Sequence, residues 1–112
     1  MCSEKELAII TNEISGLSKA VFGKQLHSVV LYGSYARGEQ DEESDIDIMV
    51  LVELPAEKLK NHKKAFIRIS SALGLEYDVL VCVTLKDCDT FFKYCSVVPF
   101  YKNVMKDGIN IA

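Results

Sequence analysis

The sequence lacks the features that mark membrane and secreted proteins. None of its apolar runs approaches the roughly 18 uninterrupted residues that a transmembrane helix needs. Glu4, Lys5 and Glu6 stand where a signal peptide would place a basic segment followed by an apolar one. Both absences predict a cytoplasmic protein that does not associate with a membrane.

Cysteine pairs of the kind that bind zinc are also missing. The four cysteines stand at positions 2, 82, 88 and 95, and no two of them form a C-x-x-C pair. In a cytoplasmic protein such thiols are expected to be reduced. Cys82 lies in an apolar, strand-like run and is predicted to be a small core residue.

The chain has no excess of basic residues either. Its 13 lysines and arginines stand against 16 aspartates and glutamates, which gives a formal net charge of −3. Proteins that grip the phosphates of nucleic acids usually have a basic face. The densest charge here is instead an acidic run between Glu39 and Asp47. This pattern predicts that the protein does not bind nucleic acid directly.

What remains is the composition of one globular domain over residues 1–112. Apolar residues make up 49% of the chain and charged residues 26%, a balance typical of folded proteins, and the chain has no repeat, low-complexity tract or linker. Periodicity, capping residues and turn residues predict its elements. They are a helix over residues 3–22, strands over 27–32 and 45–52, a helix over 55–73, a strand over 77–83, and helices over 84–94 and 99–106.

This order of elements predicts a mixed α/β domain of the α+β type. The long second helix would allow the third strand to lie beside the first two in one small mixed sheet, with the helices mainly on one face. The apolar segment 97–105 is predicted to form a C-terminal helix that packs on the core. A contact surface for a partner is the alternative interpretation of this segment.

Three carboxylates are candidate metal ligands. Asp45 and Asp47 are two residues apart at a predicted strand start, so their side chains point to one face about 6–7 Å apart. Such carboxylates repel each other, and hard divalent cations favour oxygen ligands of this kind. Asp78 interrupts the apolar third strand, where an unpaired carboxylate is rarely buried. If that strand pairs with the second, Asp78 joins a site of the kind used for two-metal displacement at phosphorus.

The segment between the first two strands predicts a phosphate site. Gly33 ends the first strand and permits close approach of a ligand to the backbone. A short helix that starts after it would direct free N–H groups at an anion, and the Ser34 hydroxyl could add a donor. Arg37 supplies a fixed positive charge suited to phosphate oxygens.

Each of these features alone has a simpler explanation. A Gly-Ser pair is mostly a turn, an Asp-x-Asp pair is often a solvated strand start, and Asp78 could be an edge-strand charge that opposes aggregation. Together, however, they occur in order on matching secondary structure, with the phosphate and metal halves in complementary places. We therefore favour the functional interpretation.

The assembled pattern resembles the nucleotidyltransferase superfamily that includes DNA polymerase β. Ten residues separate the Gly-Ser pair from the Asp-x-Asp pair, as in the signature of that superfamily. The longer form, Gly-Ser-x-Ala-Arg-Gly followed by Ser-Asp-x-Asp, is matched at Gly33, Ser34, Ala36, Arg37, Gly38, Ser44, Asp45 and Asp47. Asp78 matches the third acidic position in order and setting. The resemblance covers most of the chain, at the size of the minimal nucleotidyltransferase (MNT) proteins.

The resemblance implies a polymerase β-like fold and a transferase activity. Similar MNT proteins pair with HEPN-domain ribonuclease toxins as their antitoxins, and members of the family can transfer AMP from ATP to a tyrosine of the toxin. By this likeness the Gly33-Ser34 pair would bind the phosphates of ATP, with Arg37 beside it. Asp45 and Asp47 would hold Mg²⁺, with two ions expected. Asp78 would complete the metal site and help to deprotonate the acceptor hydroxyl.

The chain leaves almost no room for a domain that binds an acceptor, because only about thirty residues follow the third strand. The acceptor is therefore expected to come from a partner, in a hetero-oligomer with the toxin or in a homo-oligomer. Two alternatives remain open. The protein could be a non-catalytic antitoxin that neutralises its toxin by binding alone. It could also modify a small molecule such as an antibiotic, with a pocket completed by a second copy.

Overall fold

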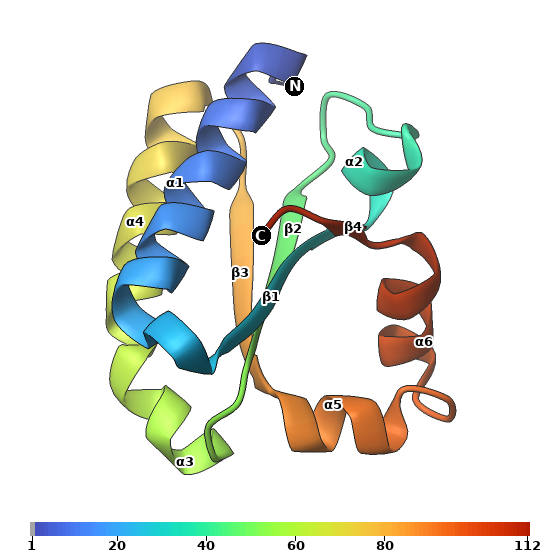
Figure 1. Cartoon of the computed structure of the whole chain (residues 1–112). Coiled ribbons are helices and arrows are strands. Elements are labelled where there is room, and N and C mark those ends of the chain that lie inside the picture. Colours follow the sequence, from blue (N-terminus) through green and yellow to red (C-terminus); the bar gives the residue numbers. More distant parts are fainter. Residues whose placement is uncertain (1) are drawn as a thin grey trace.

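A four-stranded sheet of order β3-β2-β1-β4 forms the centre of the molecule. The computed structural model describes residues 2–112, and Figure 1 shows the arrangement of its elements. The strands are β1 (Leu26–Tyr32), β2 (Ile46–Val52), β3 (Val81–Asp87) and β4 (Ile109–Asn110). The β1–β2 and β1–β4 pairs are antiparallel, whereas β2 and β3 run parallel. The predicted mixed sheet is therefore present.

Helices account for most of the remaining chain. They are α1 (Glu4–Phe22), α2 (Ser34–Arg37), α3 (Ala56–Leu59), α4 (Lys63–Tyr77), α5 (Cys88–Tyr94) and α6 (Pro99–Asp107), with short 3₁₀ turns at Gly23–Gln25 and Lys60–His62. Within residues 2–112, none of these helices combines the length and the apolar character that a bilayer crossing would require.

The first helix forms as its sequence predicts. The Ser3 side chain accepts a hydrogen bond from the Glu6 backbone N–H, and the Glu6 side chain accepts one from the Ser3 backbone, which is the predicted capping box. Ile10 and Ile14 on its apolar stripe are fully buried. Burial of this stripe against the sheet fixes α1 in place.

The predicted helix 55–73 is divided into α3, a 3₁₀ turn and α4, and α4 ends later than predicted, so the strand also starts later. The predicted strand 77–83 is wrong at its beginning, since α4 continues through Tyr77 and β3 begins only at Val81. Gly74 does not end the helix. A Cβ atom at Gly74 would lie 2.6 Å from the carbonyl oxygen of Val79, so this glycine lets the outgoing chain pass close to the helix. The helix ends instead at Asp78, which has a left-handed conformation (φ 52°, ψ 51°).

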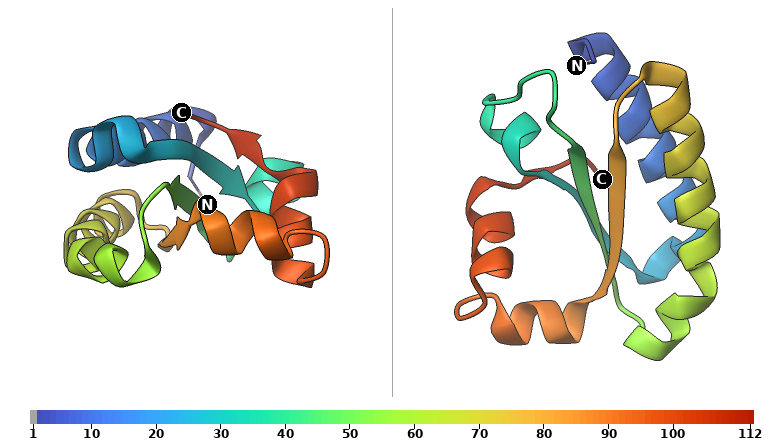
Figure 2. Two further views of the ribbon diagram at one scale, coloured as in Figure 1. Left: turned by 60° about the horizontal axis from the view of Figure 1, so that its bottom comes forward. Right: turned by 180° about the vertical axis from the view of Figure 1, so that it is seen from behind.

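The two long helices cover one face of the sheet, as predicted. Buried residues of α1 and α4 form one apolar cluster with Ile46, Ile48 and Val50 of β2. A second layer lies on the opposite face, where α5 and α6 pack through Phe91 and Val104. Figure 2 shows the sheet between these two groups of helices. This second layer is an addition to the predicted arrangement, which had helices mainly on one face.

The C-terminal segment packs on the core with only part of its apolar surface. Val104 of α6 is buried, as the predicted packing of this helix requires. On the same helix Phe100 is 47% exposed and Met105 is 55% exposed, and Val97 just before it is 67% exposed. Segment 97–105 therefore both packs on the sheet and presents apolar side chains to solvent.

Candidate functional site

The two aspartates of the Asp-x-Asp pair lie at the start of β2. Ile46 and Ile48 on either side of Asp47 are fully buried in the α1–α4 cluster, so the alternation of the strand directs Asp47 to the opposite face. Asp45 and Asp47 are both half-buried, and each has a carboxylate oxygen within 4.8 Å of the other. The predicted convergence of these two side chains is confirmed.

The third member of this cluster is a cysteine. Cys82 is the partner of Asp47 in the parallel register of β2 and β3. Its sulfur and a carboxylate oxygen from each of Asp45 and Asp47 all lie within 4.8 Å of one another. Cys82 is half-buried and belongs to neither apolar cluster, so its predicted role as a core residue is wrong.

Asp78 lies elsewhere. The predicted place on the third strand is wrong, because this residue ends α4 and is exposed, four positions before Cys82. It shares with Asp45 the lining of an open depression of about 560 Å³, to which Glu42 and Glu43 also contribute. Among the described residues, Asp78 is not part of the group that brings three candidate metal ligands together.

Electrostatics at the cluster reflect burial and mutual repulsion. Burial raises the pKa of Asp47, and the neighbouring charge of Asp45 raises it further, whereas the charge of Arg37 lowers it. Burial also raises the pKa of the Cys82 thiol, to which the charges of Asp45 and Asp47 add. Two like charges and a thiol at this distance form a site in which a bound cation would relieve the repulsion.

Gly33, which follows β1, lies against the Asp45–Asp47–Cys82 cluster. Its backbone (φ 78°, ψ −158°) lies in a region that is almost restricted to glycine. A Cβ atom here would lie 2.6 Å from the Oδ2 atom of Asp47, so the absence of a side chain lets the backbone contact this carboxylate. The predicted short helix follows at once, as α2 runs from Ser34 to Arg37 and is capped by Gly38, another residue of positive φ.

Arg37 lies at the end of α2, near the cluster. Its guanidinium forms ion pairs with Glu39 (3.3 Å) and with Asp107 of α6 (3.8 Å). Its side chain is 39% exposed, so these ion pairs are weak and can be exchanged for other anions. Arg37 also lines a small cavity of about 160 Å³ with Gly33, Tyr32 and Phe100.

Tyr32 is a residue near the site that the sequence did not reveal. It is the partner of Asp47 in the antiparallel β1–β2 register. Burial raises the pKa of Tyr32, a hydrogen bond with Thr84 lowers it, and the charge of Asp47 raises it. Its ring contacts that of Phe100 with centroids 5.5 Å apart, which links the site to α6. Its position directly before the Gly-Ser pair was the available signal.

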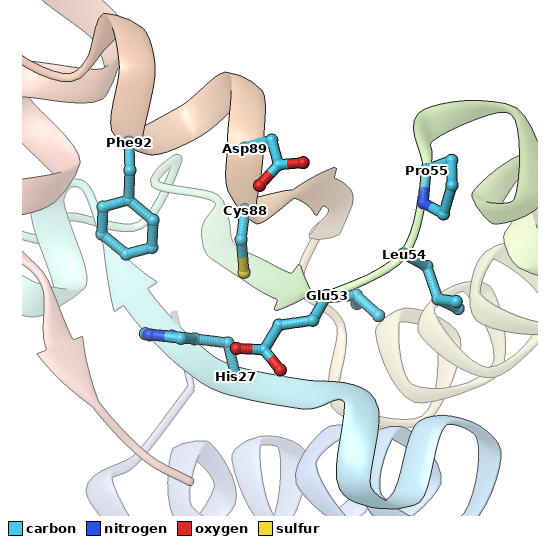
Figure 3. Close-up of a pocket in the computed structure, with 8 residues that line it drawn as sticks. His27, Glu53, Leu54, Pro55, Cys88, Asp89 and Phe92 are labelled. Carbon is cyan, nitrogen blue, oxygen red and sulfur yellow. The ribbon is translucent and has the colours of Figure 1, made fainter.

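A larger cavity lies at the opposite end of β2, and Figure 3 shows the side chains that line it. Its volume is about 580 Å³, and its lining includes His27, Glu53, Cys88 and Phe92. Val52, the last residue of β2, also belongs to the lining, whereas Asp45 precedes this strand and Asp47 is its second residue. This cavity is therefore separate from the Asp-x-Asp cluster.

Solved structures share this fold. A complex described as a toxin-antitoxin with AMP-PNP contains a chain that superimposes with a TM-score of 0.55 at 22% identity, over 91% of this chain and 72% of that one. A chain from a complex of tri-AMPylated Shewanella oneidensis HEPN toxin with MNT antitoxin gives a TM-score of 0.51 at 21% identity, over 94% of this chain and 71% of that one. At these identities the likeness shows the fold alone.

Sequence comparisons are more specific. A protein of Methanocaldococcus jannaschii named "Putative protein adenylyltransferase MJ0141" is 40% identical over 77 residues, which cover 68% of this chain and 75% of that protein. The sequence model of the nucleotidyltransferase domain matches residues 14–109, a span that includes the whole Asp-x-Asp cluster and its glycine loop. The chain therefore belongs to the nucleotidyltransferase domain family.

Proposed function

We propose that this protein transfers AMP from ATP to a hydroxyl group, a tyrosine in the first instance, of a HEPN ribonuclease toxin and thereby acts as its antitoxin. One observation carries the proposal: Asp45 and Asp47 converge beside a glycine whose backbone lies against Asp47. The 40% identical relative named as a protein adenylyltransferase supports transfer to a protein acceptor. The fold neighbours in toxin-antitoxin complexes support the class of partner.

The two aspartates fit a divalent cation. Their oxygens lie close together at the start of a buried strand, and they are hard ligands of the kind that Mg²⁺ prefers. When bound, one or two Mg²⁺ ions would neutralise charge on the phosphates and on the attacking and leaving oxygens. Asp45 and Asp47 are the residues that would hold them. Asp78 would contribute from the end of α4, where it lies outside the group of three candidate ligands but shares with Asp45 the lining of an open depression.

The loop from Gly33 to Arg37 would hold the phosphates of ATP. Gly33 has no side chain to obstruct the approach of a ligand to the backbone next to Asp47. Ser34 begins α2 and can donate its hydroxyl to a phosphate oxygen. Arg37 is partly exposed and can exchange its ion pair with Glu39 for a phosphate group.

In the reaction, the acceptor oxygen forms a bond to the α-phosphorus of ATP. The bond from that phosphorus to the oxygen bridging it to the β-phosphate breaks, pyrophosphate leaves, and the hydroxyl proton passes to water. The chain's contribution is to position ATP and to stabilise charge, which are the principal sources of catalysis in phosphoryl-group chemistry. The depression beside Asp45 is open, so a protein acceptor has direct access to the site.

The proposal is tested by incubating the protein and its purified partner with Mg²⁺ and ATP labelled at the α-phosphate. Label is expected on the partner, at a tyrosine identified by peptide mass spectrometry. The variant that combines Asp45→Asn with Asp47→Asn is the control, and it is expected to leave no label. If the partner stays unlabelled with the unmodified protein, the proposed transfer is refuted.

A second function, neutralisation by binding alone, is favoured by the exposed apolar side chains of Val97, Phe100 and Met105. Such side chains are candidates for a protein interface. The doubly substituted variant separates the two functions. Full neutralisation of the toxin by this variant would favour binding alone, whereas loss of neutralisation with retained binding would favour transfer.

A further inference from the structure

Cys82 completes a group of three candidate ligand residues with Asp45 and Asp47. It lies opposite Asp47 in the β2–β3 register, and its sulfur is within 4.8 Å of an oxygen of each aspartate. We infer that Cys82 is a metal-ligand residue whose sulfur gives this site a preference for softer divalent cations, such as Mn²⁺ or Cd²⁺, over Mg²⁺. The inference rests on the proposed function, because it assigns a further ligand to the same ion site.

The surroundings of Cys82 do not fit a purely structural role. Its side chain is half-buried and lies outside the two apolar clusters formed by the described residues. Its sheet face is the one that carries Asp47, and on β3 this face continues with Thr84, two residues along. The sulfur of Cys82 instead lies within 4.8 Å of a carboxylate oxygen of each aspartate.

The geometry is compatible with a shared ion. An ion that binds one sulfur at about 2.3 Å and one oxygen at about 2.1 Å, at a tetrahedral angle, holds these two atoms about 3.6 Å apart. The three ligand atoms lie within 4.8 Å of one another, so the side chains would need to approach by only about 1 Å. Rotation of the Cys82 and Asp47 side chains can supply this movement without a change of the strands.

Ligand chemistry then determines which ions the site prefers. Mg²⁺ demands oxygen ligands in a nearly ideal octahedron, and sulfur is a poor ligand for it. Thiolate ligands favour softer ions, with Zn²⁺ and Cd²⁺ beyond Mn²⁺ in this respect. A site of two carboxylates and one thiol is therefore expected to bind Mn²⁺ and Cd²⁺ better than a site of three carboxylates does, relative to Mg²⁺.

Cd²⁺ is the direct probe, because cadmium bound to a thiolate gives an ultraviolet charge-transfer band that carboxylates do not give. The unmodified protein is expected to develop this band on titration with Cd²⁺ alone, and Cys82→Ser is expected to lose it. Cys95→Ser is the matched control, since Cys95 is also a free, half-buried thiol, and it should retain the band. Asp45→Asn or Asp47→Asn should weaken Cd²⁺ binding at least about tenfold. A band that survives in Cys82→Ser, or that never forms, overturns the inference.

A measurement on the unmodified protein covers the case in which Cys82→Ser does not fold. Mn²⁺ is expected to protect Cys82 from alkylation by iodoacetamide, with no protection of Cys95, as read by peptide mass spectrometry. Equal alkylation of Cys82 with and without Mn²⁺ would count against the inference.

The AMP transfer assay distinguishes this inference from the proposed function. Cys82→Asp is expected to raise the ratio of the transfer rate with Mg²⁺ to that with Mn²⁺ by about tenfold. A cadmium band that depends on Cys82 together with no transfer in any metal would refute the function and leave the ion site standing. Transfer with an unchanged metal ratio in Cys82→Asp and no cadmium band would refute the ion site and leave the function standing.

Discussion

Gly33→Ala tests the proposed site through a single methyl group. At this position a Cβ atom would lie 2.6 Å from the Oδ2 atom of Asp47, whereas ordinary van der Waals contacts begin at 3.4 Å. The Asp47 carboxylate must therefore move by about 0.8 Å, or the loop must move instead. A misplacement of about 1 Å in a catalytic constellation can cost about 10²-fold in rate. We expect the transfer rate to fall by about this factor.

The substitution also strains the backbone. Alanine at the conformation of Gly33 (φ 78°, ψ −158°) is expected to lower the free energy of unfolding by about 1–3 kcal/mol. Gly38→Ala is the matched control, because Gly38 also has a positive φ of 71° but its added Cβ would meet no atom within 4 Å. This control is expected to lose about 1–2 kcal/mol of stability and to retain most of the activity.

Three measurements decide the outcome: the initial rate of AMP transfer, the binding of Mn²⁺ by calorimetry, and the free energy of unfolding in urea. Gly33→Ala should impair transfer and ion binding well beyond its loss of stability, and Gly38→Ala should not. If both variants lose stability to a similar degree and keep full transfer, the contact between Gly33 and Asp47 is irrelevant to catalysis and our reasoning is refuted.

Further predictions concern stability. Gly74→Ala is expected to lower the free energy of unfolding in urea, because its Cβ would lie 2.6 Å from the Val79 carbonyl oxygen. Gly16→Ala, on the exposed face of α1, should instead raise the free energy of unfolding by about 0.5–1 kcal/mol. The pKa of Asp47 is raised in the folded protein, so the unfolded state binds fewer protons between the two pKa values. The stability of the metal-free protein should therefore fall as the pH rises through that window, and Asp47→Asn should remove this dependence in thermal unfolding at several pH values. Asp87 accepts a hydrogen bond from the Thr90 N–H at the start of α5, and Asp87→Ala should lower the free energy of unfolding at neutral pH by about 1 kcal/mol.

Local patterns made much of this structure predictable. The capping box of α1 is formed by residues within four positions of one another. Asp45 and Asp47 point to one face because side chains alternate along an extended chain, so no distant residue is needed to predict this. Gly33 was recognisable because the glycine ends a strand and precedes a short helix. In each case the neighbours in sequence determine the conformation, so a single sequence is sufficient.

The end of α4 was not predictable in the same way. Tyr77 and Val79 with the apolar residues that follow them resemble a strand, and Gly74 resembles a helix stop. In the structure Tyr77 instead packs against the core as part of the helix, and Gly74 accommodates the Val79 carbonyl. These are tertiary contacts, which override local propensity.

The wrong placement of Asp78 on the third strand follows from that boundary. The residue opposite Asp47 depends on where β3 begins and on its parallel register with β2, and neither can be predicted from the neighbouring residues.

The second helical layer had a clearer signal in the sequence. Residues from Ile48 to Val52 are apolar without interruption, which is typical of a strand covered on both faces, and α5 and α6 supply the second cover.

In the proposed function, the open depression beside Asp45 connects binding of the partner to transfer. Glu42, Glu43, Asp45 and Asp78 line one open depression, so this side attracts a basic surface and repels an acidic one. Transfer needs the acceptor oxygen to lie within about 3–3.5 Å of the phosphorus, and the described residues include no second domain that could hold it there. A partner that docks beside the aspartates would supply both the hydroxyl and the closure of the site. In the proposed function, occlusion and modification of the toxin would then be successive consequences of one docking event. Asp47→Asn should accordingly leave the dissociation constant for the partner within about threefold while it abolishes transfer.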